Sequence, residues 1–224
     1  MSLICQCPAG TAIADVPNVV CSESFGQIQK VAFMRLRKAD GSRNAFVVSG
    51  SSGSQTGQIT KLASWEAFLE ATDGTKIVVS PYINSPADGG GDARMTGGGN
   101  DDLGGIAQVI GSEPVQFTGS LRAIPQAAAT ALKSLMCEAA VGNLGVFLFD
   151  ENGRIEAIQD GTTATTYYPI PVRGLFIGDK IHGNFDAKDS NAIQWSYAPG
   201  YSDDLAIVVP DDFNPLTDLQ NEEN

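Results

Sequence analysis

The sequence predicts an α+β protein that is mainly β, built as an antiparallel β-sandwich or barrel with one α-helix on its flank. Three observations lead to this fold class: short apolar runs of strand-like composition, turn signals between consecutive runs, and helical periodicity in only two segments. Because the strands follow one another through turns and do not alternate with helices, an antiparallel arrangement is favoured over a parallel one.

The chain length predicts one domain with an arm at each end. The 224 residues, of which 42% are hydrophobic, are enough for one packed core. We expect an N-terminal arm over residues 1–23, a single β domain over residues 24–209 and an acidic C-terminal arm over residues 210–224. Phe213, Leu216 and Leu219 are spaced apolar residues on the C-terminal arm, which is a pattern that favours docking on a neighbour.

The first strands are expected at residues 30–37 and 44–49, joined by a hairpin turn at Asp40-Gly41. Residues 30–37 are apolar on both faces, which predicts a strand that is buried on both sides. Six later strands are expected after the first helix: 76–83, 106–110, 115–121, 167–177, 192–197 and 205–209. Pro81 places a bend or an edge in the first of these, because proline cannot donate to a ladder.

Two further strands, residues 144–149 and 154–159, are joined by the strongest short hairpin signal in the chain, Asn152-Gly153. Two helices are expected. The first covers residues 61–72, with Ser64 as N-cap and with Trp65, Phe68, Leu69 and Thr72 on one side. The second covers residues 124–140, and its apolar stripe consists of Ala128, Leu132, Leu135, Met136 and Ala139.

Residues 84–105 form the least typical segment, with two glycine triplets, scattered acidic residues and almost no apolar side chains. A loop of this length is unusual inside a compact domain. We expect a long glycine-rich loop that becomes ordered by contact with another subunit. The candidate subunit-contact residues are Asp92, Arg94, Met95, Asn100 and Leu103 in this segment, together with Phe213, Leu216 and Leu219.

The charge and the hydropathy pattern exclude several classes of partner. The net charge of −12 disfavours binding to nucleic acid phosphates, yet it suits a surface past which DNA moves without sticking. No apolar run approaches the ~18 residues of a membrane span, so no membrane association is expected. The N-terminus is a poor signal peptide, which predicts synthesis in the cytoplasm.

The sequence carries no recognisable catalytic motif, and we expect neither an enzyme nor a cofactor. His182 has no partner suggested by the sequence, and the glycine triplets miss the dinucleotide fingerprint because Arg94 and Asp102 occupy its last position. Cys5 and Cys7 lie too close together for a zinc knuckle. No metal is expected, although a calcium-binding module remains an alternative through four acidic residues, Asp88, Asp92, Asp101 and Asp102.

Several segments resemble the tail tube-like structural proteins of tailed bacteriophages, especially those that infect gut Bacteroidales. The similar segments are residues 24–33, 141–153, 169–180, 195–205 and 212–219. The resemblance implies a β-sandwich with a flanking helix that assembles as hexameric rings. The rings would stack into a tube that conducts DNA during genome ejection.

The resemblance also implies partners and a location. The partners are further copies of the chain, other tail proteins, and DNA that passes through the lumen without specific binding. The long loop and the chain termini would bridge subunits and rings. The protein would be made in the cytoplasm of the host bacterium and reside in the virion. The alternatives are a head decoration or head–tail connector protein, a calcium-binding adhesin module, or a hydrolase.

Overall fold

A computed structural model describes residues 24–47, 57–100, 103–160 and 166–221 of the protein. The described residues belong to two compact units. The larger unit comprises Phe25–Gly90 and the chain from Pro114 onward, and the smaller unit includes Gly91–Glu113. The N-terminal arm expected over residues 1–23 lies outside the described residues.

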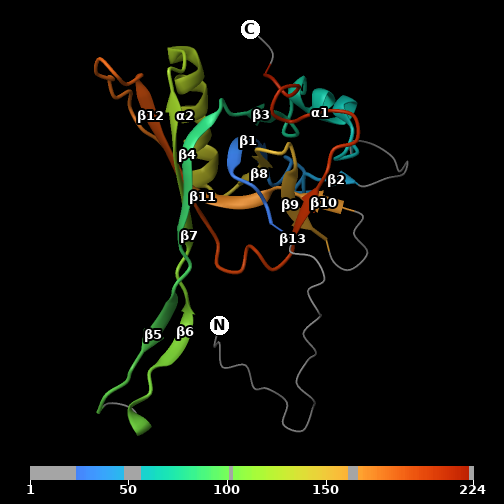
Figure 1. Ribbon diagram of the computed structural model, residues 1–224. Helices are drawn as coiled ribbons and strands as arrows, with labels where there is room; N and C mark the ends of the chain where they lie inside the picture. Colours follow the sequence, from blue (N-terminus) through green and yellow to red (C-terminus); the bar gives the residue numbers. More distant parts are fainter. Residues whose placement is uncertain (1–23, 48–56, 101–102, 161–165, 222–224) are drawn as a thin grey trace. The chain divides into compact units, whose positions relative to one another are not determined.

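The larger unit is built on an antiparallel sheet that curls into a half-barrel (Figure 1). Its described strands are β1 (Ile28–Arg35), β2 (Phe46–Val47), β3 (Ile77–Val79), β4 (Ile83–Gly90), β7 (Val115–Arg122), β8 (Leu144–Asp150), β9 (Ile155–Gln159), β10 (Thr166–Tyr168), β11 (Ile170–Ile177), β12 (Ser190–Tyr197) and β13 (Leu205–Val208). The main path runs β2-β10-β9-β8-β11-β12-β7-β4, with β1 joining β8 to β3 and with β13 added to β9. The predicted fold class, α+β and mainly β, is confirmed.

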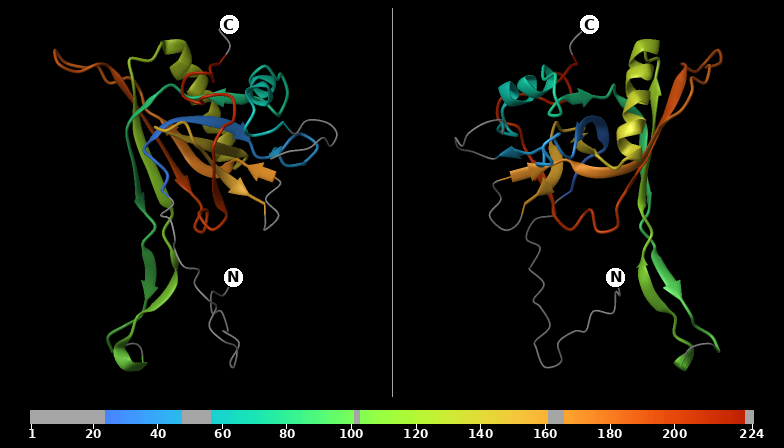
Figure 2. Two further views of the ribbon diagram at one scale, coloured as in Figure 1. Left: turned by 45° about the vertical axis from the view of Figure 1, so that its right-hand side comes forward. Right: turned by 180° about the vertical axis from the view of Figure 1, so that it is seen from behind.

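Two helices pack on this sheet. Helix α1 (Leu62–Leu69) buries Trp65, Phe68 and Leu69, as its periodicity predicts, and it lies beside β3. Helix α2 (Gln126–Ala140) packs against β11 and β8, and both views of Figure 2 show it alongside the sheet. The predicted flanking helix is therefore present.

Strands β1 and β8 form an antiparallel pair that is buried on both faces, with Val31 opposite Leu148 and Phe33 opposite Val146. Successive side chains of a strand point to opposite faces, so alternate residues of this pair enter two different cores. One core contains Val31, Phe33, Val146 and Leu148, and the other contains Ala32, Met34, Phe147 and Phe149. The expectation that residues 30–37 are buried on both sides is confirmed for residues 30–34, whereas Arg35 and Arg37 are exposed.

Each core is organised around a fully buried tryptophan. In the core beside α2, Trp195 stacks on Phe117 with ring centroids 4.0 Å apart. In the core beside α1, Trp65 stacks on Phe46 at 4.4 Å and meets Phe147 edge-on at 5.3 Å. Aromatic pairs of this geometry add to the stabilisation from burial. Trp65 also donates from its indole nitrogen to the Ile59 carbonyl at 2.8 Å.

The β8–β9 hairpin turns at the predicted Asn152-Gly153, where Gly153 adopts φ +74°. Asp150 closes this turn although its side chain is completely buried. Its carboxylate accepts hydrogen bonds from the backbone nitrogens of Asn152 at 3.0 Å, Arg154 at 2.8 Å and Gly26 at 3.0 Å. The Arg154 guanidinium adds an ion pair at 2.5 Å. One carboxylate therefore fixes the hairpin and also holds the chain that enters β1.

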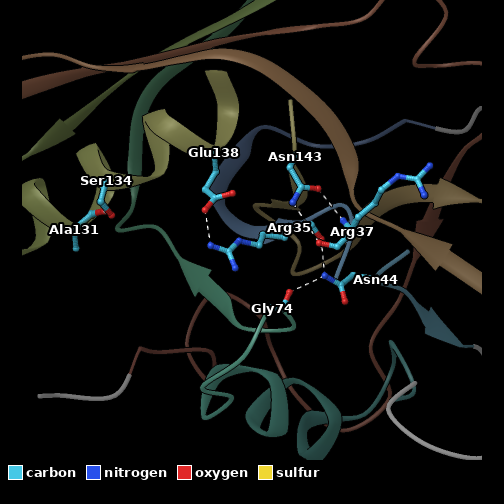
Figure 3. A network of polar contacts seen from close by, with 8 residues as sticks. All are labelled: Arg35, Arg37, Asn44, Gly74, Ala131, Ser134, Glu138 and Asn143. Atoms are coloured by element: carbon cyan, nitrogen blue, oxygen red, sulfur yellow. Dashed lines mark hydrogen bonds and ion pairs between the residues drawn. The ribbon is translucent and has the colours of Figure 1, made fainter. Parts of the chain in front are cut away.

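A polar network joins the end of β1 to three other segments (Figure 3). The Asn143 side chain accepts from the Arg37 backbone nitrogen at 2.9 Å, and the Asn44 side chain donates to the carbonyls of Arg35 and Gly74 at 2.8 Å each. Arg35 forms an ion pair with Glu138 of α2 at 2.5 Å. These bonds satisfy backbone groups where the ladder ends and the chain changes direction.

Two local expectations are wrong, and a third is confirmed in part. Ser64 does not cap α1; its hydroxyl accepts from the Gln58 nitrogen at 2.8 Å, and Lys61 holds the cap position. The segment after Asp40-Gly41 does turn back, but its strand β2 pairs with β10 and not with β1. The interruption expected at Pro81 in the strand over residues 76–83 is present: the chain divides there into β3 and the start of β4, because proline has no N–H to donate to a ladder.

Replacing Asp150 with Asn is expected to lower the free energy of unfolding by about 3 kcal/mol, because it removes one partner of a buried ion pair. Urea denaturation at neutral pH measures this change. Glu151→Gln, at the exposed neighbouring position, is the matched control and should change stability by less than about 0.5 kcal/mol.

The same carboxylate predicts an acid dependence. Burial by itself would raise the pKa of Asp150, but hydrogen bonds from Arg154, Gly26 and Asn152 together hold this pKa below its usual value. A carboxylate with a depressed native pKa contributes stability that is present above its unfolded-state pKa and is lost as the pH falls through the native pKa. The Asp150→Asn variant should lack this part of the acid dependence. Equal behaviour of Asp150→Asn and Glu151→Gln would contradict the assigned role.

Candidate functional site

The segment expected as a glycine-rich loop is largely a paired β-ribbon. Residues up to Gly90 belong to β4, which pairs with β7. In the smaller unit, β5 (Ala93–Thr96) pairs antiparallel with β6 (Gln108–Ser112), and Leu103–Gly105 forms a short 3-10 turn between them. We call the described part of Gly91–Glu113 the ribbon. The prediction of a long glycine-rich loop over residues 84–105 is therefore wrong for residues 84–90 and 93–96, which lie in paired strands.

The glycines that suggested a loop serve the bends of the ribbon. Gly97, Gly98 and Gly99 all adopt positive φ, which residues with a Cβ rarely do. The Gly99 nitrogen donates to the Gly105 carbonyl at 3.3 Å and closes the end of the ribbon. The strands themselves lack the alternation of apolar and polar residues that marks a half-buried strand, because the ribbon has no core to cover.

The ribbon exposes large apolar side chains. Met95 is 57% exposed, Ile106 73%, Val109 61% and Ile110 48%. Met95 lies directly opposite Val109 in the register, so these two side chains share one face. Ile110 lies between Val109 and Gly111 at a β-bulge. An isolated two-stranded ribbon is at best marginally stable in water, and it gains stability when its apolar side chains are covered. The ribbon is therefore the strongest candidate for a docking surface.

The structure brings five of the predicted contact residues into this ribbon. Arg94 and Met95 lie on β5 with exposed side chains, and the Asp92 carbonyl accepts from the Glu113 nitrogen at 2.8 Å beside them. Asn100 is exposed at the turn after the glycine triplet, and Leu103 begins the 3-10 turn. Ile106, Val109 and Ile110 were missed as contact candidates, although their apolar character next to the glycine-rich segment is visible in the sequence.

The C-terminal segment uses its apolar residues differently from the expectation. Leu219 is completely buried in the core beside α1, and Phe213 and Leu216 pack against the same core. Leu219 is therefore wrong as a subunit-contact residue, because its side chain is already covered within its own chain. Phe213 and Leu216 retain only partial exposure.

Three side chains hold the C-terminal segment in place, and one of them is Tyr82, whose hydroxyl donates to the Leu216 carbonyl at 3.0 Å. The buried ammonium of Lys30 donates to the carbonyls of Leu216 at 3.2 Å and Leu219 at 2.6 Å. The Asn221 side chain accepts from the Val79 nitrogen at 2.8 Å and donates to the Val79 carbonyl at 2.6 Å, in the manner of one more strand residue on β3. Burial lowers the pKa of Lys30.

The groups considered for chemistry are not assembled into a site in the described part of the chain. His182 is exposed, with its Nδ1 3.6 Å from Asp189 Oδ2. Within the described ranges, no three His, Cys, Asp or Glu side chains are grouped as metal ligands, while Asp101 and Asp102 fall outside these ranges. Asp88 belongs to the larger unit and Asp92 to the smaller. Cys137 is an exposed free thiol, and Cys5, Cys7 and Cys21 lie outside the described residues.

Neither described helix is long and apolar enough to cross a membrane.

Comparisons with known proteins add no relative: the chain matches no protein-family model and no curated protein. The functional interpretation therefore rests on the ribbon, on the docked C-terminal segment and on the chemistry of the larger unit.

Replacing Lys30 with Met is expected to loosen residues 216–221, because two carbonyls lose the ammonium that binds them. The expected loss in the free energy of unfolding is about 1–3 kcal/mol. Hydrogen exchange of this segment measures the local effect, and urea denaturation measures the global one. Lys76→Met, at an exposed position, serves as the matched control. Unchanged exchange at residues 216–221 in Lys30→Met would refute the assigned role of Lys30.

Proposed function

We propose that this chain is a structural subunit that self-assembles through its ribbon, and more specifically that it forms stacked rings in the tail tube of a tailed bacteriophage. The observation that carries the proposal is the ribbon with four exposed large apolar side chains, Met95, Ile106, Val109 and Ile110. Large apolar side chains gathered in the open on one short element are typical of an interaction site.

The edges of the ribbon support a second copy of the chain as its partner. Among the described strands, β5 and β6 pair only with each other, so each presents one edge without a ladder partner. An unpaired edge is a template for strand addition by another chain. In a ring, every subunit would present the same ribbon to the same surface of its neighbour, which lets one interface close the assembly.

Two features besides the ribbon support the proposal of a tail tube. The mainly β fold with a flanking helix has the character that the resemblance implies. The net charge of −12 suits a lumen through which DNA must slide without binding, because phosphates are repelled by an acidic wall.

The assembly is tested with the full-length protein by light scattering during gel filtration and by negative-stain electron microscopy. We expect rings, and tubes at high protein concentration. Averaged end views give the ring symmetry: a sixfold ring that stacks supports the tail tube, whereas discrete rings that never stack support a connector. A strictly monomeric protein at high concentration would overturn the proposal.

A double variant, Met95→Asp with Val109→Asp, tests the ribbon itself. Two buried carboxylates at one interface are costly, so we expect a loss of association of at least about tenfold. Phe185→Asp is the matched control, because Phe185 is a fully exposed apolar residue outside the ribbon. Circular dichroism checks that the fold of the larger unit is retained. Association of the double variant at the wild-type level would show that the ribbon is not the contact surface.

A further inference from the structure

The larger unit contains a cavity of about 320 Å³ that the proposed assembly role does not use. Residues of seven strands (β1, β4, β7, β8, β9, β12 and β13) and of the β12–β13 connection line it. Its chemically important lining residues are Asp88 on β4, Glu156 on β9, Tyr197 on β12 and Tyr201 in the connection, with Phe117 and Leu205 among its apolar walls. This volume is at the lower end of the range for ligand pockets, about 300–1,000 Å³, and it suits a small group better than a cofactor.

Two carboxylates face this cavity without a cation. None of the ion pairs in the described part of the chain involves Asp88 or Glu156. Burial, and then the charges of Asp88 and Asp150, raise the pKa of Glu156 to about 7. Partial desolvation beside the cavity also raises the pKa of Asp88, although most of its side chain is accessible to solvent. The nearby Arg154 is already engaged with Asp150, so it does not neutralise Glu156.

A buried hydroxyl supplies a second and independent observation. The Tyr197 side chain is 1% exposed, and within the described residues its Oη has no hydrogen-bond partner. A buried polar atom without a partner is costly, and native proteins rarely leave one unless a ligand or water completes it. Burial raises the pKa of Tyr197 well above its usual value. The nearby Trp195 indole N–H opposes this increase, but it does not form a hydrogen bond of ordinary geometry with Tyr197 Oη.

The tyrosines also offer an aromatic wall. The rings of Tyr197 and Tyr201 are stacked, with centroids 4.4 Å apart and an interplanar angle of 12°. The face of a tyrosine ring attracts cations through its quadrupole. A cavity with two unpaired carboxylates, one unsatisfied phenolic oxygen and a tyrosine stack is therefore complementary to a cation that carries N–H donors.

We propose that this cavity binds an organic cationic group, an alkylammonium or an alkylguanidinium, between the carboxylates of Asp88 and Glu156 and beside the Tyr197–Tyr201 stack. Such a group donates hydrogen bonds to both carboxylates, and a small rotation of the Tyr197 ring toward the cavity brings its Oη, which is covered in the free protein, into contact with a third N–H. An alkyl stem on the cation contacts the apolar wall of Phe117 and Leu205. A metal ion fits less well, because the cavity provides two carboxylates and one neutral hydroxyl, fewer ligands than hard cations take from proteins.

The binding should depend on pH, since a bound cation favours ionised Glu156. The groups that act on Glu156 are Asp88, Asp150 and the two tyrosines, which remain neutral near pH 7 because their pKa values are raised. Between pH 8 and pH 6, Glu156 passes from mostly ionised to mostly protonated. The affinity for the cation should therefore be about tenfold lower at pH 6 than at pH 8.

The test uses the full-length protein with ¹³C-labelled glutamate and ring-labelled tyrosine, observed by NMR. The probes are n-propylguanidinium and n-butylammonium, and 1-butanol is the neutral control of similar size. We expect both cations, but not butanol, to shift the Tyr197 resonances saturably and to lower the pKa of Glu156. Equal binding of butanol, or no saturable shift with either cation, would overturn the proposal.

Variants identify the site. Glu156→Gln and Tyr197→Phe should each weaken cation binding at least about fivefold at pH 8. Glu66→Gln, an exposed acid on α1, should leave it unchanged. Asp88→Asn, where most of the side chain is exposed, provides the same test if the half-buried Glu156→Gln or the buried Tyr197→Phe variant fails to fold. Wild-type affinity in folded Glu156→Gln and Asp88→Asn would refute the assignment.

One further arm distinguishes the source of the cation. Arg94 is exposed on β5 and is the one cationic side chain among the described residues of the ribbon, so in an assembly it could supply a guanidinium to a second copy. This arm rests on the proposed function, whereas the probe experiments do not. If Arg94→Gln and saturating n-propylguanidinium each lower self-association, the cation comes from another subunit. If neither affects association while the probe still binds, the cavity takes a free small cation.

Discussion

The structure of the larger unit depends on one strand pair, β1 with β8, that is buried on both faces. The backbone polar groups of these strands are satisfied by the ladder between them and by the strands on either side. Their side chains alternate between two cores, so the pair acts as the shared wall of both. Helix α2 covers one core and helix α1 the other. A change of register by one residue would send every side chain of the pair to the wrong core, and this constraint fixes the positions of the neighbouring strands.

Buried charged side chains lie where the β1–β8 pair meets segments without regular secondary structure. Asp150 at the end of β8 accepts hydrogen bonds from backbone N–H groups of the hairpin and of the segment before β1. Lys30 on β1 donates hydrogen bonds to backbone carbonyls of the C-terminal segment. Each charged group satisfies several backbone atoms that have no ladder partner, which compensates for part of its desolvation. The C-terminal segment thereby becomes part of the second core. These contacts disfavour an extended C-terminal arm that is free to reach a neighbour.

The ribbon differs from the larger unit in how little of its surface is buried. Its strands bury almost nothing within the described chain, and its largest apolar side chains face solvent. Stability for such an element has to come from another surface, which is the physical basis for proposing self-assembly. The acidic cavity also contains groups without partners. Within the described residues its two carboxylates have no ion-pair partner, and the Tyr197 hydroxyl has no hydrogen-bond partner. Both features are explained by something that binds, an apolar surface with a free strand edge in one case and an organic cation in the other.

The sequence by itself determined the elements whose signals are local. The apolar run over residues 30–37, the Asn152-Gly153 turn and the helical periodicities of residues 61–72 and 124–140 each reflect a local conformational preference, and each appears in the structure. Only the tertiary structure decided which strands pair: β2 pairs with β10 and not with β1, which is nearer in the sequence. The pairing of the ribbon strands was also visible only in the structure, because their sequences have no hydrophobic pattern. The burial of Leu219 and the meeting of Asp88, Glu156 and Tyr197 were equally inaccessible from sequence. These residues come from segments far apart in the chain, and their contacts arise from the curl of the sheet, for which no local pattern codes.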